Sequence, residues 1–156
     1  MPLLPTAFVT TLKPILGDEW TPFEAALNEE PVTSVRLNDK IDLSIEGDCV
    51  PWCSQGRYLA ERPNFTRDPL FHAGAYYVQE ASSMFVDRVL RQYVDCKIVM
   101  LDMCAAPGGK STAALGALPE GSVLVSNEPV RPRANILAEN LTKWGSPCTM
   151  VTNAYP

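Results

Sequence analysis

The sequence predicts an α/β protein in which a small α+β domain precedes the first half of a doubly wound parallel sheet. Two observations support this prediction. The second half of the chain alternates apolar runs with helical stretches in the order strand, helix, strand, helix, strand. The first half instead mixes short alternating segments with turns rich in proline and glycine. We therefore expect two domains, over residues 1–73 and residues 74–156.

Helices in the first domain are predicted from apolar spacing and capping residues. Apolar residues at helical spacing predict a helix over residues 3–16, which Gly17 would stop, although Pro14 indicates an earlier end. Thr21 to Glu24 fits a capping box with proline at the first helical position. A second helix is therefore expected over residues 22–28.

Strands in the first domain are predicted from the alternation of apolar and polar residues. The expected strands cover residues 33–37, 41–46, 49–52 and 57–60. For residues 41–46 a short helix is the alternative, and a turn is expected at Gly56. Residues 63–74 are predicted to be a loop, because proline and glycine punctuate them.

The second domain is predicted to begin with a helix and to continue as a parallel sheet. Helices are expected over residues 80–93, 110–118 and 129–144, and strands over residues 98–101 and 122–127 and from residue 149. The predicted inner face of the first helix consists of Ala81, Met84, Phe85, Val89 and Leu90. That of the last helix, which Gly145 should end, consists of Val130, Ala134, Leu137, Leu141 and Trp144.

The segment most informative about function joins the first parallel strand to the next helix. An apolar run ends in Asp102, a turn of small residues follows over residues 104–109, and Lys110 begins a helix. A strand, a tight turn and a helix N-terminus let backbone N–H groups approach an anionic or zwitterionic ligand. In an α/β sheet this position is typical of a nucleotide-like cofactor.

Three interpretations of this turn compete. A phosphate-binding P-loop fits Gly109, Lys110 and Ser111, but its first glycine would fall on Cys104, and Pro107 stiffens the turn. An S-adenosylmethionine loop instead needs an acid at the end of each of two successive strands. Asp102 and Glu128 meet that need, and Glu128 would hold the ribose hydroxyls. A third interpretation is a junction whose glycines serve packing alone. We favour the S-adenosylmethionine loop.

Four segments, in the right order along the chain, carry a resemblance to a known family. Residues 102–110 (DMCAAPGGK) resemble the cofactor motif of the Sun/Fmu-type RNA (cytosine-5) methyltransferases, the Nop2/Sun family. Residues 72–84 resemble the segment before the methyltransferase domain of that family, and residues 35–38 resemble its R-x-N element. Residues 131–145 resemble the helix after the ribose-binding acid.

The resemblance implies a Rossmann-like domain that binds S-adenosylmethionine. The implied cofactor-binding residues are Cys104, Ala105, Ala106, Pro107, Gly108, Gly109, Lys110 and Glu128. The catalytic Pro-Cys and Thr-Cys-Ser segments of the family would lie beyond Pro156, so the resemblance implies no catalytic residue here and a fragment that is inactive alone. Where the family usually has a further acid, this chain has Tyr155, and Asn153 or an apolar contact with Tyr155 would take over that role.

The resemblance also implies a mechanism and a partner. In the complete enzyme a cysteine thiolate attacks carbon 6 of a flipped cytosine, and carbon 5 then takes the methyl group from the sulfonium cofactor. We expect ribosomal RNA rather than transfer RNA as the partner. The alternatives are a non-catalytic RNA-binding module and, less favoured, a P-loop nucleotide hydrolase.

Local basic residues are the candidates for RNA contact. Arg57, Arg62 and Arg67 occur with Tyr58 and Phe65, a combination that suits unstacked RNA bases. The alternative is a solvated loop in which the arginines pair with Glu61 and Asp68. Arg36 and Asn38 could likewise contact RNA or form a buried hydrogen-bond network. For Arg133 a surface ion pair is favoured over contact with cofactor or RNA.

Composition restricts the remaining possibilities. The 156 residues carry a formal net charge of -5, which argues against binding nucleic acid through bulk electrostatics. No apolar run is long enough to cross a membrane. The five cysteines lack framework spacing, so we expect reduced thiols and a cytoplasmic protein. Cys49 and Cys53 lack a second pair of ligands, and no metal site is expected.

Overall fold

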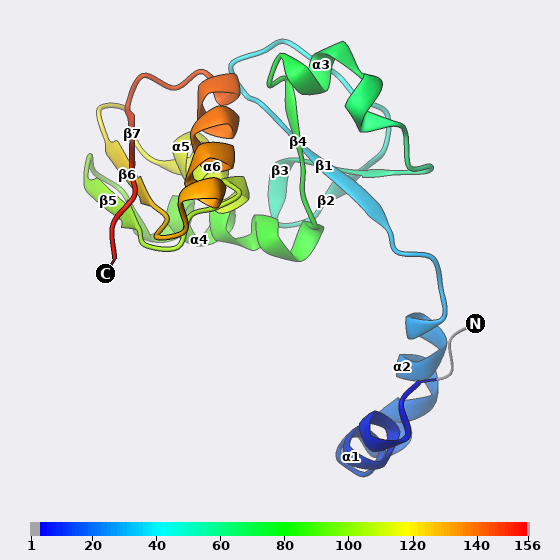
Figure 1. Cartoon of the computed structure of the whole chain (residues 1–156). Helices are drawn as coiled ribbons and strands as arrows, with labels where there is room; N and C mark the ends of the chain where they lie inside the picture. Colours follow the sequence, from blue (N-terminus) through cyan, green and yellow to red (C-terminus); the bar gives the residue numbers. More distant parts are fainter. Residues whose placement is uncertain (1–3, 156) are drawn as a thin grey trace. The chain divides into compact units, whose positions relative to one another are not determined.

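The computed structural model describes residues 4–155 of the chain (Figure 1). Leu3, in the first predicted helix, and Pro156 therefore lie outside the described residues. The chain divides into two compact units after Val32, and each unit is described by itself. Within the described residues, no helix combines the length and the apolar character needed to span a bilayer.

The first unit consists of helices α1 (Thr6–Leu16) and α2 (Trp20–Leu27), joined by the short 3₁₀ helix η1 (Gly17–Glu19). Pro14 lies inside α1, so the expectation of an earlier end was wrong. A proline removes one backbone donor from a helix, but α1 continues to Leu16. Gly17 follows as the C-cap at φ 52° and donates its N–H to the carbonyl of Lys13.

The predicted capping box is also wrong. Because η1 leads directly into α2, this helix begins at Trp20 and its N-terminus has no side-chain cap. The carboxylate of Glu24 accepts a hydrogen bond of 3.0 Å from the indole N–H of Trp20. Trp20 is buried, and its ring lies 5.9 Å from that of Phe23. The helical start is thus fixed by packing of Trp20.

The second unit begins with an antiparallel sheet in the order β2-β3-β1-β4. Its strands are β1 (Thr33–Leu37), β2 (Asp48–Val50), β3 (Cys53–Leu59) and β4 (Tyr76–Val78). β1 is central and all five of its residues are buried. Residues 41–46 form neither the predicted strand nor the alternative helix. Their alternation has another cause, because Leu43 and Ile45 pack against the core beside β1.

Gly56 lies inside β3, opposite Arg36 of β1, so the predicted turn at this glycine was wrong. The turn that joins β2 to β3 is at residues 51–52. A Cβ at Gly56 would lie 2.7 Å from the side chain of Val50 and 2.8 Å from the sulfur of Met84. Close packing on this strand, and not a reversal of the chain, therefore requires the glycine.

The region between β3 and α4 contains more structure than the sequence predicts. The predicted loop over residues 63–74 holds the 3₁₀ helix η2 (Phe65–Arg67) and the short helix α3 (Pro69–His72). Asp68 caps α3 by accepting a hydrogen bond of 2.9 Å from the backbone N–H of Leu70. β4, which follows, was not expected. It is three residues long and is held by pairing with β1.

The helix predicted over residues 80–93 is divided into η3 (Ala81–Met84) and α4 (Phe85–Tyr93). Ala81 and Met84 are buried as predicted, but Phe85 and Val89 are exposed. The change from 3₁₀ to α geometry rotates the inner face, and Asp87 takes a buried position there. Its carboxylate pairs with Arg91 at 2.9 Å, which satisfies the buried charge.

The parallel sheet has the predicted order of strands and helices. It contains β5 (Val99–Asp102), β6 (Val123–Asn127) and β7 (Thr149–Thr152), with β6 in the centre. The connecting helices are α5 (Gly109–Ala117) and α6 (Arg131–Trp144). Both lie on the side of this sheet that faces the antiparallel sheet (Figure 1). The predicted α/β fold class is confirmed.

The buried face of α6 agrees with its prediction at all positions but one. Ala134, Leu137, Leu141 and Trp144 are buried, whereas Val130 precedes the helix as its N-cap and is 48% exposed. Gly145 is the C-cap at φ 71°, as predicted. Leu137 and Leu141 pack against Ala105 and Ala106. The helix therefore supports the turn that leaves β5.

Candidate functional site

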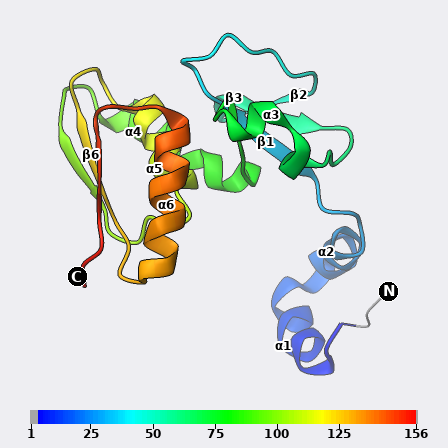
Figure 2. The same ribbon diagram turned by 45° about the horizontal axis from the view of Figure 1, so that its top comes forward.

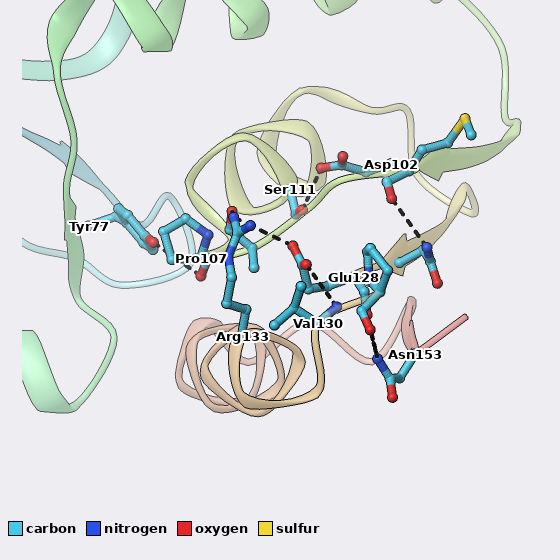
Figure 3. A network of polar contacts seen from close by, with 12 residues as sticks. Tyr77, Asp102, Pro107, Ser111, Glu128, Val130, Arg133 and Asn153 are labelled. Carbon is cyan, nitrogen blue, oxygen red and sulfur yellow. Dashed lines mark hydrogen bonds and ion pairs between the residues drawn. The ribbon is translucent and has the colours of Figure 1, made fainter. Parts of the chain in front are cut away.

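The candidate site lies where β5 and β6 end (Figure 3). The turn after β5 is pinned to the neighbouring strand, because Ala105 donates its N–H to the carbonyl of Asn127 at 2.9 Å. Within the turn, Gly108 donates to the carbonyl of Ala105 at 2.8 Å. Ala105, Ala106 and Gly108 are buried, whereas the side chains of Cys104, Pro107 and Lys110 are exposed. The turn thus offers an accessible rim on a fixed backbone.

Both glycines of the turn have a structural reason. Gly108 has φ 110°, a left-handed conformation that favours glycine, and it is the N-cap of α5. A Cβ at Gly109 would lie 3.3 Å from both Tyr77 and Gln79. No described side chain makes a capping hydrogen bond at this end of α5. Its first-turn N–H groups can therefore bind an anion.

The acid at the end of β5 is tied to α5. Ser111 donates its hydroxyl to the carboxylate of Asp102 at 2.7 Å, as Figure 3 shows. This bond joins the last residue of the strand to the first turn of the helix. Asp102 therefore fixes the two ends of the turn relative to each other.

Glu128 follows β6 and is 1% exposed. Its Oε1 accepts a hydrogen bond of 3.1 Å from the N–H of Val130. Its Oε2 is shielded from solvent and accepts no hydrogen bond within the described part of the chain. A buried carboxylate oxygen without a donor is costly, and it is a ready acceptor for hydroxyl groups of a ligand.

Arg133 joins the two halves of the site. Its guanidinium lies 3.5 Å from Oε2 of Glu128 and donates a hydrogen bond of 3.0 Å to the carbonyl of Ala106. The predicted ion pair of Arg133 is thus present, but its partner is a buried acid and not a surface group. The turn after β5 and the acid after β6, predicted separately, are brought together by this one side chain (Figure 3).

Asn127 is a site residue that sequence reasoning missed. Its amide donates to the carbonyls of Met103 (3.2 Å) and Ala154 (2.9 Å). Its oxygen accepts from the N–H of Ala154 and the hydroxyl of Thr152. The side chain therefore links the ends of all three parallel strands. The available signal was a polar residue at the end of an apolar run, directly before the acid.

Near the end of the chain, where the family usually has an acid and this chain has Tyr155, the structure offers the amide of Asn153. Asn153 donates to the carbonyl of Glu128 at 2.6 Å and to that of Pro129 at 3.0 Å. It thereby holds the backbone that carries Glu128. Tyr155 is 88% exposed.

Two hollows lie beside the turn and meet at Tyr77. The first, of about 240 Å³, is lined by residues of β4 and η3 and by the turn itself, including Cys104 and Lys110. The second, of about 160 Å³, has aromatic walls that include Phe71 and Trp144. Tyr77 lines both hollows and donates its hydroxyl to the carbonyl of Pro107 at 3.2 Å. Burial raises the pKa of Tyr77, so this hydroxyl stays protonated.

The R-x-N element is a buried hydrogen-bond network. Arg36 and Asn38 are 3% and 2% exposed. Arg36 binds the first turn of α5, and Asn38 donates to the carbonyls of Gly74 (2.9 Å) and Trp144 (3.1 Å). Of the two interpretations of this element, the structure therefore supports the network and not RNA contact.

Of the three other arginines proposed for RNA contact, Arg57 and Arg62 are engaged within the fold. Arg57 donates to the carbonyls of Ser54 and Gly56, both at 2.7 Å. The guanidinium of Arg62 lies 5.5 Å from the ring centre of Phe65. Within the described residues, neither Glu61 nor Asp68 forms an ion pair with these arginines. Their contact with RNA stays a prediction.

Comparison with known proteins identifies the family. A family model described as the N-terminal domain of 16S rRNA methyltransferase RsmF matches residues 4–81. A second, described as 16S rRNA methyltransferase RsmB/F, matches residues 79–155. The chain belongs to the 16S rRNA methyltransferase RsmB/F family. The resemblance to Sun-type methyltransferases predicted from the sequence is confirmed.

Individual members of the RsmB/F family and related structures agree with this assignment. Ribosomal RNA small subunit methyltransferase F of Pectobacterium atrosepticum is 31% identical over 169 residues, covering 96% of this chain and 34% of that protein. The chain thus spans about a third of the length of the curated relatives it matches.

Among solved structures, a methyltransferase homologue from Pyrococcus horikoshii is 25% identical with a TM-score of 0.74, covering 88% of this chain and 48% of that one. NSun6 from Pyrococcus horikoshii with SFG is 26% identical with a TM-score of 0.53, covering 60% and 24%.

Proposed function

We propose that this chain is the cofactor-binding part of an RNA (cytosine-5) methyltransferase. In this proposal the enzyme transfers a methyl group from S-adenosylmethionine to a cytosine of ribosomal RNA. The family match and the names of the curated relatives support the reaction class and the kind of RNA. The single observation that carries the cofactor proposal is the buried Oε2 of Glu128 beside the turn after β5, which accepts no hydrogen bond from the described residues.

The residues fit the chemistry of S-adenosylmethionine. Oε2 of Glu128 is the acceptor for the ribose hydroxyls, and its burial strengthens such hydrogen bonds. The backbone over residues 104–109 and the start of α5 lie toward the methionine carboxylate, with Lys110 nearby. The side chain of Arg133 is 55% exposed and lies 3.5 Å from Oε2. When the ribose binds, this side chain either stays in contact with Oε2 or moves away from it. The similarity to NSun6 with SFG, an analogue of S-adenosylmethionine, supports the same ligand.

The chain's own part in the reaction is to bind and orient the methyl donor. The bound cofactor supplies an activated methyl group on a sulfonium. The turn and Glu128 hold the two ends of that cofactor, and the hydrogen bonds from Asn127 and Asp102 keep the strand ends fixed around it. We assign the catalytic thiolate to no residue of this chain, and Cys104 belongs to the cofactor turn.

The proposal also covers domains, RNA and location. We keep the division into residues 1–73 and residues 74–156, and we assign RNA contacts to the first of these domains. The hollow with aromatic walls beside Tyr77 would also suit unstacked bases, although apart from Phe71 its lining belongs to the second domain. The bacterial ribosomal RNA methyltransferases among the relatives support a cytoplasmic location.

Calorimetric titration of S-adenosylmethionine and S-adenosylhomocysteine tests the cofactor proposal. We expect the chain to bind both ligands and Glu128→Gln to bind them about 10- to 100-fold more weakly, because a hydrogen bond to a charged group contributes about 1.5–3 kcal/mol. Gln keeps the size of the side chain and an acceptor for the N–H of Val130. Glu139→Gln, on the exposed face of α6, is the matched control and should bind normally. A folded chain that binds neither ligand, or an unaffected Glu128→Gln, would contradict the proposal.

A further inference from the structure

Arg36 is a buried cation that contacts the candidate cofactor-binding turn only at a backbone carbonyl, that of Gly109. It lies in β1 and is 3% exposed. Within residues 4–155 it forms no ion pair, and its donors go to neutral acceptors instead. Nε donates to the side chain of Gln79 at 2.9 Å, and NH2 donates to the hydroxyl of Thr112 at 2.5 Å. The guanidinium also lies 4.6 Å from the ring centre of Trp144, a favourable cation–π contact.

The remaining partners of Arg36 belong to the first turn of α5. NH2 donates to the carbonyl of Gly109 at 3.2 Å, and NH1 to that of Thr112 at 3.4 Å. The hydroxyl of Thr112 in turn donates to the carbonyl of Gly108 at 2.9 Å. Arg36 therefore holds, directly and through Thr112, the residues whose N–H groups begin the helix. This network fixes where those N–H groups point.

The charge of Arg36 adds to the effect of its hydrogen bonds. Burial lowers the pKa of Arg36 to about 10, while the thiol of Cys53 and the carboxylates of Asp87 and Asp39 oppose this shift. The side chain is therefore still protonated at neutral pH. Asp87 is already paired with Arg91. A positive charge that lies behind a helix N-terminus in a medium of low dielectric favours an anion at that end.

We propose that Arg36 is a positioning residue that sets the affinity of the turn for the carboxylate at the amino-acid end of the cofactor. It acts through Thr112, Gly108 and Gly109 and through its field, without contacting the ligand. The proposal rests on the proposed function, because it assumes that S-adenosylmethionine binds at this turn. A general structural role would affect the binding of all ligands alike. In this proposal, a change of Arg36 should weaken the binding of only those ligands that carry the amino-acid group.

Asn38, which directly follows the same strand, supplies a matched control. It is as buried as Arg36, and its amide also makes two hydrogen bonds to backbone carbonyls. Those carbonyls belong to Gly74 and to Trp144, the last residue of α6, and neither belongs to the turn. A substitution of Asn38 should therefore weaken the packing of β1 without changing the turn.

The experiment compares two ligands by calorimetry on the full chain. S-adenosylhomocysteine carries the amino-acid group, and methylthioadenosine has the same adenosine without it. We expect Arg36→Lys to weaken the binding of S-adenosylhomocysteine at least about tenfold, the size of one lost charge-assisted interaction. The binding of methylthioadenosine should weaken by no more than about twofold. Asn38→Ser should lower the thermal midpoint and leave the ratio of the two affinities as in the wild type.

A second pair of variants covers the case in which Arg36→Lys does not fold. Thr112→Val removes the hydroxyl that accepts from Arg36, and Thr112→Ser keeps it. The first should lose affinity for S-adenosylhomocysteine selectively, and the second should restore it. The proposal would be overturned if Arg36→Lys and Thr112→Val weakened the binding of both ligands equally or left the ratio of the two affinities unchanged. Either result would leave the proposed cofactor site intact. A folded wild type that binds neither ligand would overturn this proposal together with the proposed function.

Discussion

Asp68 shows how single side chains set the pH range in which this fold is stable. Its carboxylate accepts hydrogen bonds from the hydroxyl of Tyr76 at 2.5 Å and from the N–H of Leu70 at 2.9 Å. The bond from Tyr76, and then that from Leu70, lowers the pKa of Asp68. Burial, followed by the hydrogen bond to Asp68, raises the pKa of Tyr76. Each group therefore favours the protonation state that the other needs at neutral pH.

The variant Asp68→Asn should make stability less sensitive to acid. The pKa of Asp68 is lowered on folding, so its contribution is present above the ordinary carboxylate pKa of about 3.9 and is lost as the pH falls through the folded pKa. Urea unfolding should therefore show the wild type more stable than the variant at neutral pH, with the difference closing in acid. Asp42→Asn, at an exposed carboxylate, is the control. A difference that stays constant with pH would refute this assignment.

At the scale of elements, the parallel sheet could be predicted and the antiparallel sheet only in part. The order of β5, α5, β6, α6 and β7 follows from apolar periodicity and from the punctuation of the chain. In the antiparallel sheet, Gly56 marks close packing and not a turn, and residues 41–46 alternate without pairing. Contacts between segments distant in the sequence decide both cases, and local patterns do not encode them.

The same distinction applies to the candidate site. The turn and Glu128 were predicted because each follows directly after an apolar strand. Asn127 was not assigned a role, and for Arg36 a buried network was one of two alternatives, because their partners are mainly backbone carbonyls and polar side chains from other elements. Any residue type can supply a carbonyl, so the sequence carries little signal for such contacts.

Two glycine substitutions test this interpretation of the antiparallel sheet. Gly56→Ala should lower the free energy of unfolding by about 1–3 kcal/mol, because the added methyl group overpacks against Val50 and Met84. Gly116→Ala is the matched control in α5, where the nearest atoms to a new Cβ are 3.6 Å or more away, on Asp39. There alanine should add up to about 1 kcal/mol through helix propensity. Urea unfolding of both variants measures the two effects. An unchanged free energy of unfolding in Gly56→Ala would show that β3 can shift to make room for the methyl group.

On the scale of the second unit, the described residues cover the parallel sheet on one face only. α5 and α6 lie together on one side of it in both views (Figures 1 and 2). The strand register places Leu101, Val125 and Met150 side by side on the other face. Val99, Leu101 and Met150 are 77%, 57% and 57% exposed. Contiguous exposed apolar side chains of this kind mark a surface that water solvates poorly.

This open face should be detectable with a hydrophobic fluorescent dye. We expect the folded chain to bind the dye anilinonaphthalene sulfonate, and Leu101→Lys combined with Met150→Lys to reduce its fluorescence at least about twofold, because the two charges interrupt the apolar patch. Both side chains are exposed, so the free energy of unfolding should change by no more than about 0.5 kcal/mol per substitution. Tyr93→Lys, at an exposed aromatic on α4, is the control for a general effect of added charge. If the double variant binds the dye as the wild type does, the dye reports loosened packing elsewhere and not this face of the sheet.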